Sequence, residues 1–264
     1  MGYRLLKVSF DMAVRKVHVL MKKEDIHAEK IACNKVVVVL DILLATTSIV
    51  SALDNGAIQV IPVIDAEEGV RISQQIAADR FILAGELDAK PLEGFRYPNP
   101  LELNKEVKGK TLILSTTNGT IALRKSNAAG KVYISSLLNN FFVAQTTLKE
   151  DPEQTIVIVC SGNAGEVSLE DFYGAGHFVS CLLEQTSVSL KLSDAALSAL
   201  SFYRGWQGDA AHALQSSKVG RLLYKHSREV LSFAADKGSV HMAPMLINGV
   251  ITNTSGVELR TDRL

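Results

Sequence analysis

Val36-Val37-Val38-Val39-Leu40-Asp41 is the stretch that decides the fold. Its five consecutive apolar residues, four of them β-branched, are typical of a central strand that helices cover on both faces. Further strands are expected at residues 58–63, 80–84, 111–114, 132–134 and 155–159, with helices between them at 46–53, 66–78, 119–125 and 138–149. This alternation predicts an α/β fold, a three-layer α/β/α arrangement around a parallel or mixed sheet.

The segments outside this alternation are less regular. Residues 5–10 and 16–21 alternate apolar and polar side chains, which predicts two antiparallel strands in an edge hairpin. Residues 85–107 contain three prolines and show no period, so we expect a long loop that could close over a site. After residue 182 the sequence indicates mostly helix, with an irregular patch at 205–208 and a late strand at 244–251.

The length of 264 residues bounds the number of domains. It is near the upper size of one α/β domain, and no shift in composition marks a linker. We therefore expect a single unit over residues 1–264. Two closely packed subdomains, about 1–110 and 111–264, are the alternative.

Charge and composition exclude several classes of function. Lys and Arg together number 28 and Asp and Glu together 28, so no net field favours nucleic acid or an anionic membrane. No apolar run reaches the roughly 20 residues of a membrane span, and no secretory signal is recognisable, so a cytoplasmic protein is expected. Three cysteines without C-x-x-C spacing, and histidines without zinc-site spacing, argue against disulfides and a zinc hydrolase.

Polar residues gather where apolar strands end. Asp41 follows the first central strand, and Ser115-Thr116-Thr117-Asn118-Gly119-Thr120 follows the strand at 111–114. The carboxyl ends of strands are where open α/β sheets bind ligands. Hydroxyls and backbone N–H groups in the second segment can bind an anion, and Gly119 lets the backbone approach it closely. The plain structural alternative is that Asp41, Thr117 or Asn118 only caps a helix.

A third polar segment follows the strand at 155–159. It begins at Cys160-Ser161-Gly162 and continues to Ser168, whose hydroxyl is placed to cap a helix that carries Glu170 and Asp171 in its first turn. Adjacent acids do not share one helix face, so at most one of the two would point into a cleft. A site for a hard cation such as Mg²⁺ would combine one of them with Asp41 or Glu86.

Taken together, these segments resemble the 2-phosphosulfolactate phosphatase family. The resemblance covers roughly residues 30–180, and more weakly the C-terminal part. It rests on Val38-Val39-Leu40-Asp41 with Ala45-Thr46-Thr47, Ala84-Gly85-Glu86, Gly94-Phe95 with Pro100-Leu101-Glu102, Thr116 to Thr120, Cys160-x-Gly162, and Ser168-Leu169-Glu170-Asp171 with Ala175-Gly176.

The resemblance implies a Mg²⁺-dependent phosphatase that hydrolyses 2-phospho-3-sulfolactate, or a similar 2-phospho acid, to 3-sulfolactate and phosphate. Its partner would be a small acidic phosphorylated substrate, without nucleic acid or membrane, and a homo-oligomer is compatible with it. It implies catalytic roles for Asp41, Glu170 and Asp171, and metal binding by these three together with Glu86. Substrate binding is expected at Thr46, Thr47, Thr116, Thr117, Asn118, Gly119 and Gly162.

One departure from the family pattern bears on activity. The family usually has an arginine before the Ala-Thr-Thr run, and Leu44 stands there in this chain. An arginine fork binds phosphate or sulfonate strongly, whereas leucine offers neither charge nor donor. A non-catalytic or weakly active anion-binding member of the family is therefore the alternative. A nucleotide-dependent oxidoreductase ranks last, because the chain lacks a G-x-G-x-x-G turn after its first strand.

Overall fold

A computed structural model describes residues 14–206 and 209–253 of the chain. The strands are β1 Arg15–Leu20, β2 Cys33–Leu40, β3 Gln59–Val63, β4 Phe81–Leu87, β5 Lys90–Pro91, β6 Thr111–Ser115, β7 Ala129–Ser135, β8 Thr155–Cys160, β9 Leu190–Leu192, β10 Pro244–Ile247 and β11 Val250–Asn253. The helices are α1 Ala28–Ile31, α2 Ala45–Asp54, α3 Ala66–Ser73, α4 Pro100–Leu103, α5 Gly119–Ser126, α6 Asn140–Leu148, α7 Leu169–Gln185, α8 Asp194–Gly205, α9 Ala210–Gln215, α10 Lys218–His226 and α11 Arg228–Ala234.

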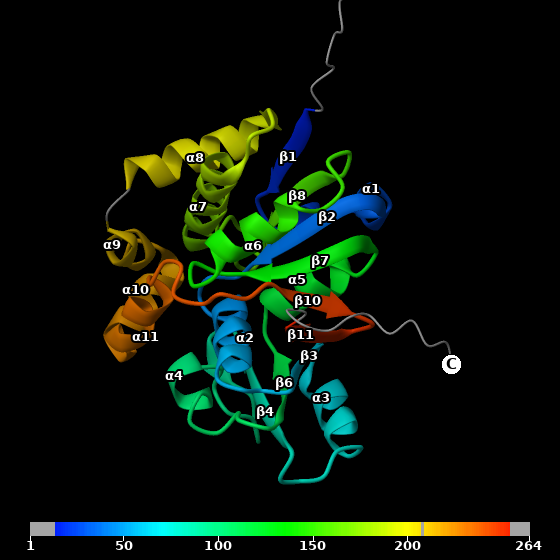
Figure 1. The fold of residues 1–264 in the computed structure, drawn as a ribbon. Helices are drawn as coiled ribbons and strands as arrows, with labels where there is room; N and C mark the ends of the chain where they lie inside the picture. The colour runs from blue at the N-terminus through cyan, green and yellow to red at the C-terminus, as the bar shows by residue number, and fades with distance from the viewer. Residues whose placement is uncertain (1–13, 207–208, 254–264) are drawn as a thin grey trace, which may run out of the picture.

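The strands form one mixed sheet in the order β5-β4-β6-β3-β11-β10-β7-β2-β8-β1-β9 (Figure 1). Strands β4, β6 and β3 are parallel to one another, as are β7, β2, β8, β1 and β9, while the short β5 pairs with β4 in the antiparallel sense. The antiparallel hairpin β10–β11 joins these two parallel groups, since β10 pairs with β7 and β11 with β3. Each parallel group contains strands from before and after residue 110.

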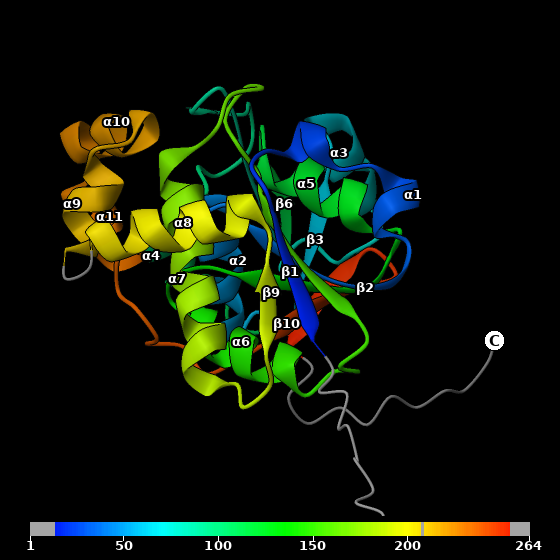
Figure 2. The same ribbon diagram turned by 90° about the horizontal axis from the view of Figure 1, so that it is seen from above.

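Helices cover both faces of the larger parallel group, and the alternation of β2 shows why. Val36, Val38 and Leu40 face one apolar cluster, which includes residues of α7 and α8. Val37 and Val39 face a second cluster, which includes residues of α2 and α5. A strand buried on both faces is therefore apolar at every position. Figure 2 shows α7 and α8 on one side of this part of the sheet and α5 on the other, which confirms the expected α/β fold.

The prediction of an edge hairpin is wrong for its second strand, which is β1 in the structure. β1 is not an edge strand, because it lies between β8 and β9 and is parallel to both. The other strand of that hairpin, residues 5–10, lies outside the described residues. Alternation of apolar and polar residues shows which side chains lie on each face of a strand, but it does not show the direction of the neighbouring strands. The carboxyl end of β1 therefore joins the same edge of the sheet as that of β8.

The structure corrects two other expectations. Residues 244–251 form a hairpin rather than one strand, because Asn248 and Gly249 adopt φ angles of 51° and 81° and turn the chain between β10 and β11. Two residues with positive φ are typical of a tight hairpin turn. The expected loop at 85–107 contains the end of β4, β5 and α4. Within the described residues, no helix is long and apolar enough to cross a membrane.

Candidate active site

A cavity of about 270 Å³ lies where the polar segments after the strands converge. Asp41 follows β2, Glu86 lies in the last part of β4, and Thr116, Thr117 and Asn118 follow β6. All five residues line the cavity, and Asn163 and Ala164 from the segment after β8 line it as well. The structure therefore brings together three of the segments that the sequence singled out.

Hydroxyls of the first turn of α2 hold Asp41 in place. Thr46 Oγ1 donates to the carbonyl oxygen of Asp41 at 2.9 Å and accepts from its backbone N–H at 3.0 Å. Thr47 Oγ1 donates to the carbonyl oxygen of Ile42 at 2.8 Å. Both threonines are fully buried, and neither lines the cavity. Their predicted role in substrate binding stays a prediction, and the contacts that they make position the turn that carries Asp41.

The carboxyl group of Asp41 is nearly buried, with 7% of the residue exposed. Burial, together with the negative charges of Glu86 and Glu170, raises its pKa to about 7, while the backbone N–H of Ala45 and the ammonium of Lys23 act in the opposite direction. A low-dielectric environment and like charges both disfavour the ionised form. Ionised Asp41 is therefore disfavoured in the cavity, first by burial and then by the two nearby acids.

Glu170 and Asp171 lie close to Asp41 without lining the cavity. Asp171 Oδ1 accepts from the N–H of Ile42 at 2.8 Å, and its Oδ2 accepts from the N–H of Gly162 at 3.1 Å. Asp171 thus ties together the segments that follow β2 and β8. Burial and the charges of Asp41 and Glu170 raise its pKa well above its ordinary value.

Glu170 is also buried, with 3% exposed, and it accepts hydrogen bonds from the hydroxyls of Ser168 and Ser217. Burial raises its pKa. Ser168 caps α7 as the sequence predicts, since its side chain accepts from the N–H of Asp171. Ser217 is the N-cap of α10, so Glu170 connects the strand-end cluster to a helix near the C-terminus of the chain.

The turn after β6 has both locked and open donors. Thr116 and Thr120 bond each other's backbone N–H and hydroxyl groups, and the N–H of Thr117 donates to Glu86 Oε1 at 2.7 Å. By contrast, the N–H groups of Asn118 and Gly119 have no recorded acceptor among the described residues. N–H groups at the start of a helix are suited to bind an anion.

Gly119 allows α5 to approach Asp41. A Cβ atom at this position would lie 2.6 Å from Asp41 Oδ2 and 2.4 Å from the Cβ of Ala45. Both distances are far shorter than van der Waals contact. Glycine is therefore required here by the close packing of the α5 N-terminus against the β2–α2 turn, and the expected close approach of its backbone to an anion stays a prediction.

Gly162 has a different reason for being glycine. Its φ angle is +70°, and a Cβ atom would lie 2.8 Å from both the carbonyl oxygen of Glu166 and the Cβ of Lys22. The residue does not line the cavity. Gly162 shapes the loop whose next two residues, Asn163 and Ala164, do line it.

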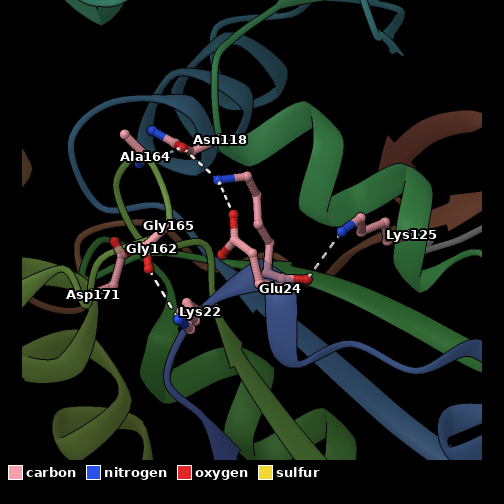
Figure 3. Close-up of polar contacts among 9 residues, drawn as sticks. Lys22, Glu24, Asn118, Lys125, Gly162, Ala164, Gly165 and Asp171 are labelled. Carbon is pink, nitrogen blue, oxygen red and sulfur yellow. Dashed lines mark hydrogen bonds and ion pairs between the residues drawn. The ribbon is translucent and has the colours of Figure 1, made fainter.

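Two lysines near the cavity were not among the residues expected from the sequence. Lys23 is 6% exposed, and its Nζ donates to Asn118 Oδ1 at 2.7 Å. Figure 3 shows the surrounding contacts, which connect the segments after β1 and β8 with the start of α5. Lys22-Lys23 directly follow a parallel strand, so the strand-end rule would have found them had β1 not been assigned to an edge hairpin. Lys218, in the first turn of α10, lines the cavity itself, and no local pattern marks it.

The rest of the wall is mostly apolar. Leu43, Leu44, Tyr97, Pro98, Val219 and Leu222 line it. Among the described residues that line the cavity, Lys218 is the one basic side chain, and it pairs with Glu166 at 3.6 Å. Leu44 thus lies on the cavity wall, where the family's usual arginine would add a positive charge.

No group of three or more His, Cys, Asp or Glu side chains in the described residues is arranged to hold a metal ion. Of the metal ligands expected from the sequence, Asp41 and Glu86 line the cavity, and the carboxylate residue Asp88, which was not expected, lines it as well. Mg²⁺ at phosphate sites commonly takes one or two carboxylates, with waters and phosphate oxygens as its other ligands. Two carboxylates in one cavity, with the charge of Glu86 raising the pKa of Asp41, fit such an open site.

Comparisons with known proteins agree on one family. The family model described as 2-phosphosulpholactate phosphatase matches residues 20–249. A protein of Clostridium acetobutylicum named probable 2-phosphosulfolactate phosphatase is 34% identical over 238 residues, which cover 89% of this chain and 99% of that protein. Proteins with the same name from Clostridium novyi and Clostridium beijerinckii are 40% and 31% identical, over 71% and 90% of this chain and 78% and 99% of their own lengths.

Proposed function

Because this chain belongs to the 2-phosphosulfolactate phosphatase family, we propose that it is a Mg²⁺-dependent phosphatase that hydrolyses 2-phospho-3-sulfolactate, or a similar 2-phospho acid. The products are 3-sulfolactate and inorganic phosphate. In this reaction a water oxygen bonds to phosphorus, the bond from phosphorus to the C2 oxygen breaks, and that oxygen takes a proton.

The observation that carries this proposal is the pairing of two carboxylates with open N–H donors in one cavity. Asp41 and Glu86 contribute carboxylates and Asn118 contributes its backbone N–H, while the N–H of Gly119, which does not line the cavity, lies next to it at the start of α5. Carboxylates alone would repel a phosphate ester, and N–H groups alone would bind it without neutralising its charge. The combination suits a phosphate that arrives with a divalent cation.

Asp41 and Glu86 would hold the Mg²⁺. When bound, the ion neutralises phosphate oxygens and the charge that develops on them. The protein's own groups then bind and orient the phosphate through the N–H groups of Asn118 and Gly119. Glu170 and Asp171 act as positioning residues, since their contacts hold the β2–α2 turn and α10 around the cavity.

The wall that contains Lys218 would bind the remaining acidic part of the substrate. Leu43 and Leu44 also line the cavity, and their apolar side chains give no donor to an anion. Lys218 supplies the positive charge for the sulfonate. Its pairing with Glu166 is exposed on both sides and costs little to exchange for a substrate anion.

Leu44 supports a second candidate function, an anion-binding protein with weak or no turnover. Its side chain lies on the cavity wall, where an arginine would contribute charge to the transition state. Under this alternative, calorimetry detects binding of sulfolactate with Mg²⁺ while no phosphate is released. Leu44→Arg would then raise phosphate release.

A panel of small phosphorylated hydroxy acids, assayed for phosphate release with Mg²⁺ and with excess chelator, tests the proposal. We expect release from 2-phospho-3-sulfolactate that exceeds release from 2-phospholactate and disappears in chelator. Unchanged release in chelator would refute the metal assignment, and absence of release from every 2-phospho acid would refute the phosphatase.

A further inference from the structure

We propose that Lys23 is a positioning residue, which fixes the side-chain amide of Asn118 so that its nitrogen faces the substrate phosphate. This inference rests on the proposed function, because it takes the cavity to be the phosphate site. Lys23 does not line the cavity. Its effect would pass through Asn118, which does line it.

The contacts of Asn118 determine which way its amide points. Oδ1 receives the ammonium of Lys23 at 2.7 Å and the backbone N–H of Ala164 at 3.3 Å. An ammonium and a backbone N–H can only donate, so both require an oxygen at this position. The amide nitrogen is thereby assigned by its neighbours, and a flipped amide would place donors against donors.

The nitrogen of this amide is left open. No acceptor for Asn118 Nδ2 is recorded among the described residues, and in Figure 3 the amide nitrogen points away from the dashed contact that the oxygen makes. Its two N–H donors add to the backbone N–H groups of Asn118 and Gly119 at the same helix start. The donors of Asn118, which lines the cavity, together with the adjacent N–H of Gly119, suit phosphate oxygens.

The surroundings of Lys23 hold it in one place. Its backbone N–H donates to the carbonyl oxygen of Ser161 at 3.2 Å, and the Nζ of Lys125 donates to its carbonyl oxygen at 3.5 Å. Its ammonium also pairs with Glu24 at 3.0 Å. The side chain is 8% exposed, so it is shielded from the solvent that would otherwise loosen a lysine.

The ammonium also places a fixed positive charge behind the phosphate site. It lowers the proton affinity of Asp41 and so partly balances the cavity carboxylates. In a chain with leucine at position 44, this charge reaches the phosphate through the polarised amide of Asn118 rather than by direct contact.

A double-mutant cycle in the full-length protein tests this route. Asn118→Ala should lower kcat/KM about 100-fold, as removal of an oxyanion donor does elsewhere. Lys23→Met should lower it about tenfold, because the amide is then free to flip. The double variant should match Asn118→Ala alone, since Lys23 has no effect once the amide is gone. Losses that multiply to about 1,000-fold would overturn the proposal.

Lys125→Met is the matched control. It removes an ammonium that contacts Lys23 but has no recorded contact with Asn118, so kcat/KM should change less than about twofold. An equal loss in this variant and in Lys23→Met would show a general effect of charge or packing, and would overturn the route through Asn118.

Two further measurements keep the test decisive. The affinity for inorganic phosphate with Mg²⁺, measured by calorimetry, should fall in the same pattern across the variants. If Lys23 and Asn118 are coupled in phosphate binding but no substrate is hydrolysed, the phosphatase proposal is refuted and the role of Lys23 stands. If substrate is hydrolysed but the two residues are not coupled, the role of Lys23 is refuted and the phosphatase proposal stands. If Lys23→Met does not fold, Asn118→Asp replaces it, because this variant keeps the contact with Lys23 and presents oxygen to the phosphate. Wild-type activity in Asn118→Asp would overturn the proposal.

Discussion

The molecule buries reactive side chains in two places. One is the group of carboxylates at the strand ends, and the other is a cluster of Asn140, His177 and Cys181 inside the helical layer. Asn140 belongs to α6, and His177 and Cys181 belong to α7. His177 Nε2 lies 3.5 Å from Cys181 Sγ, and its Nδ1 lies 3.1 Å from Asn140 Nδ2. By residue type this second cluster resembles a thiol catalytic site, whereas the first is a set of acids.

Hydrogen bonding separates the two clusters. Asn140 Nδ2 also donates to the carbonyl oxygen of Gly174, so the atom facing His177 is the nitrogen and His177 Nδ1 is an acceptor. Nε2 then carries the proton and cannot take one from Cys181. Burial lowers the pKa of His177 to about 3 and raises that of Cys181 to about 12. A cluster with matched donors and acceptors stabilises the fold, while one with open donors on a cavity can bind a ligand.

Asp41→Asn should have the largest effect in this comparison. It keeps the shape of the side chain but removes a carboxylate that would hold Mg²⁺, so kcat/KM for the 2-phospho acid should fall about 1,000-fold or more. Steady-state phosphate release measures it. Cys181→Ala, in the closed cluster, is the control and should keep kcat/KM within about twofold while lowering Tm. Strong loss in Cys181→Ala would contradict the division between the clusters.

Gly119→Ala should have the next largest effect. The added methyl group would overlap Asp41 Oδ2 and Ala45, so the turn or the helix must shift. A displacement of about 1 Å at a site can cost about 100-fold in rate. Gly205→Ala is the matched control, because a Cβ atom at Gly205 meets nothing within 4 Å. Normal activity of Gly119→Ala in the same assay would show that this close approach is not needed.

Lys218→Gln should have a smaller and selective effect. If Lys218 binds the second acidic group, KM for 2-phospho-3-sulfolactate should rise about tenfold, while KM for 2-phospholactate, which lacks the sulfonate, should change little. Lys225→Gln on the same helix removes a lysine that does not line this cavity and serves as control. Equal changes in KM for the two substrates would assign Lys218 no part in selectivity.

The pH dependence of stability should show the smallest effect. The pKa of Asp41 rises from 3.8 to about 7 on folding, so the folded state holds its proton more tightly than the unfolded state does. Stability is therefore greatest below about pH 4 for this group and falls as pH rises towards 7. In chelator, Tm should fall between pH 5 and pH 8, and Mg²⁺ should raise Tm more at pH 8 than at pH 5. A Mg²⁺ effect that is larger at pH 5 would contradict this.

Much of the fold could be predicted because hydrophobic runs report burial directly. The apolar run at 36–40 forms a strand that is buried on both faces. Asp41, Glu86 and Asn118, which lie at the ends of strands or just after them, line one cavity, as expected for the carboxyl ends of parallel strands. The direction of β1 could not be predicted, because pairing with β8 and β9 depends on contacts more than 100 residues away in sequence. Asn248-Gly249 is a local sequence signal for a hairpin turn, and the prediction of a single strand at 244–251 did not take it into account.

The candidate site was predictable only in part. The sequence predicted that Glu170 or Asp171 lies near Asp41. Whether such an acid faces the cavity or binds backbone N–H groups depends on tertiary packing. The carboxylate of Asp171 accepts from the N–H groups of Ile42 and Gly162. Lys23 follows β1, and the strand-end rule finds it only once β1 is known to be parallel to β8, whereas no spacing connects Lys218 with the strand-end segments. Their positions follow from the tertiary fold alone.

The most direct test of the central claim is a crystal structure of the protein with Mg²⁺ and orthovanadate, which mimics a phosphoryl group in transfer. We expect the metal between Asp41 and Glu86, and vanadate oxygens within hydrogen-bonding distance of Asn118 Nδ2 and the N–H of Gly119. Vanadate bound elsewhere, or held in this cavity without contact to Asn118 or the metal, would contradict it.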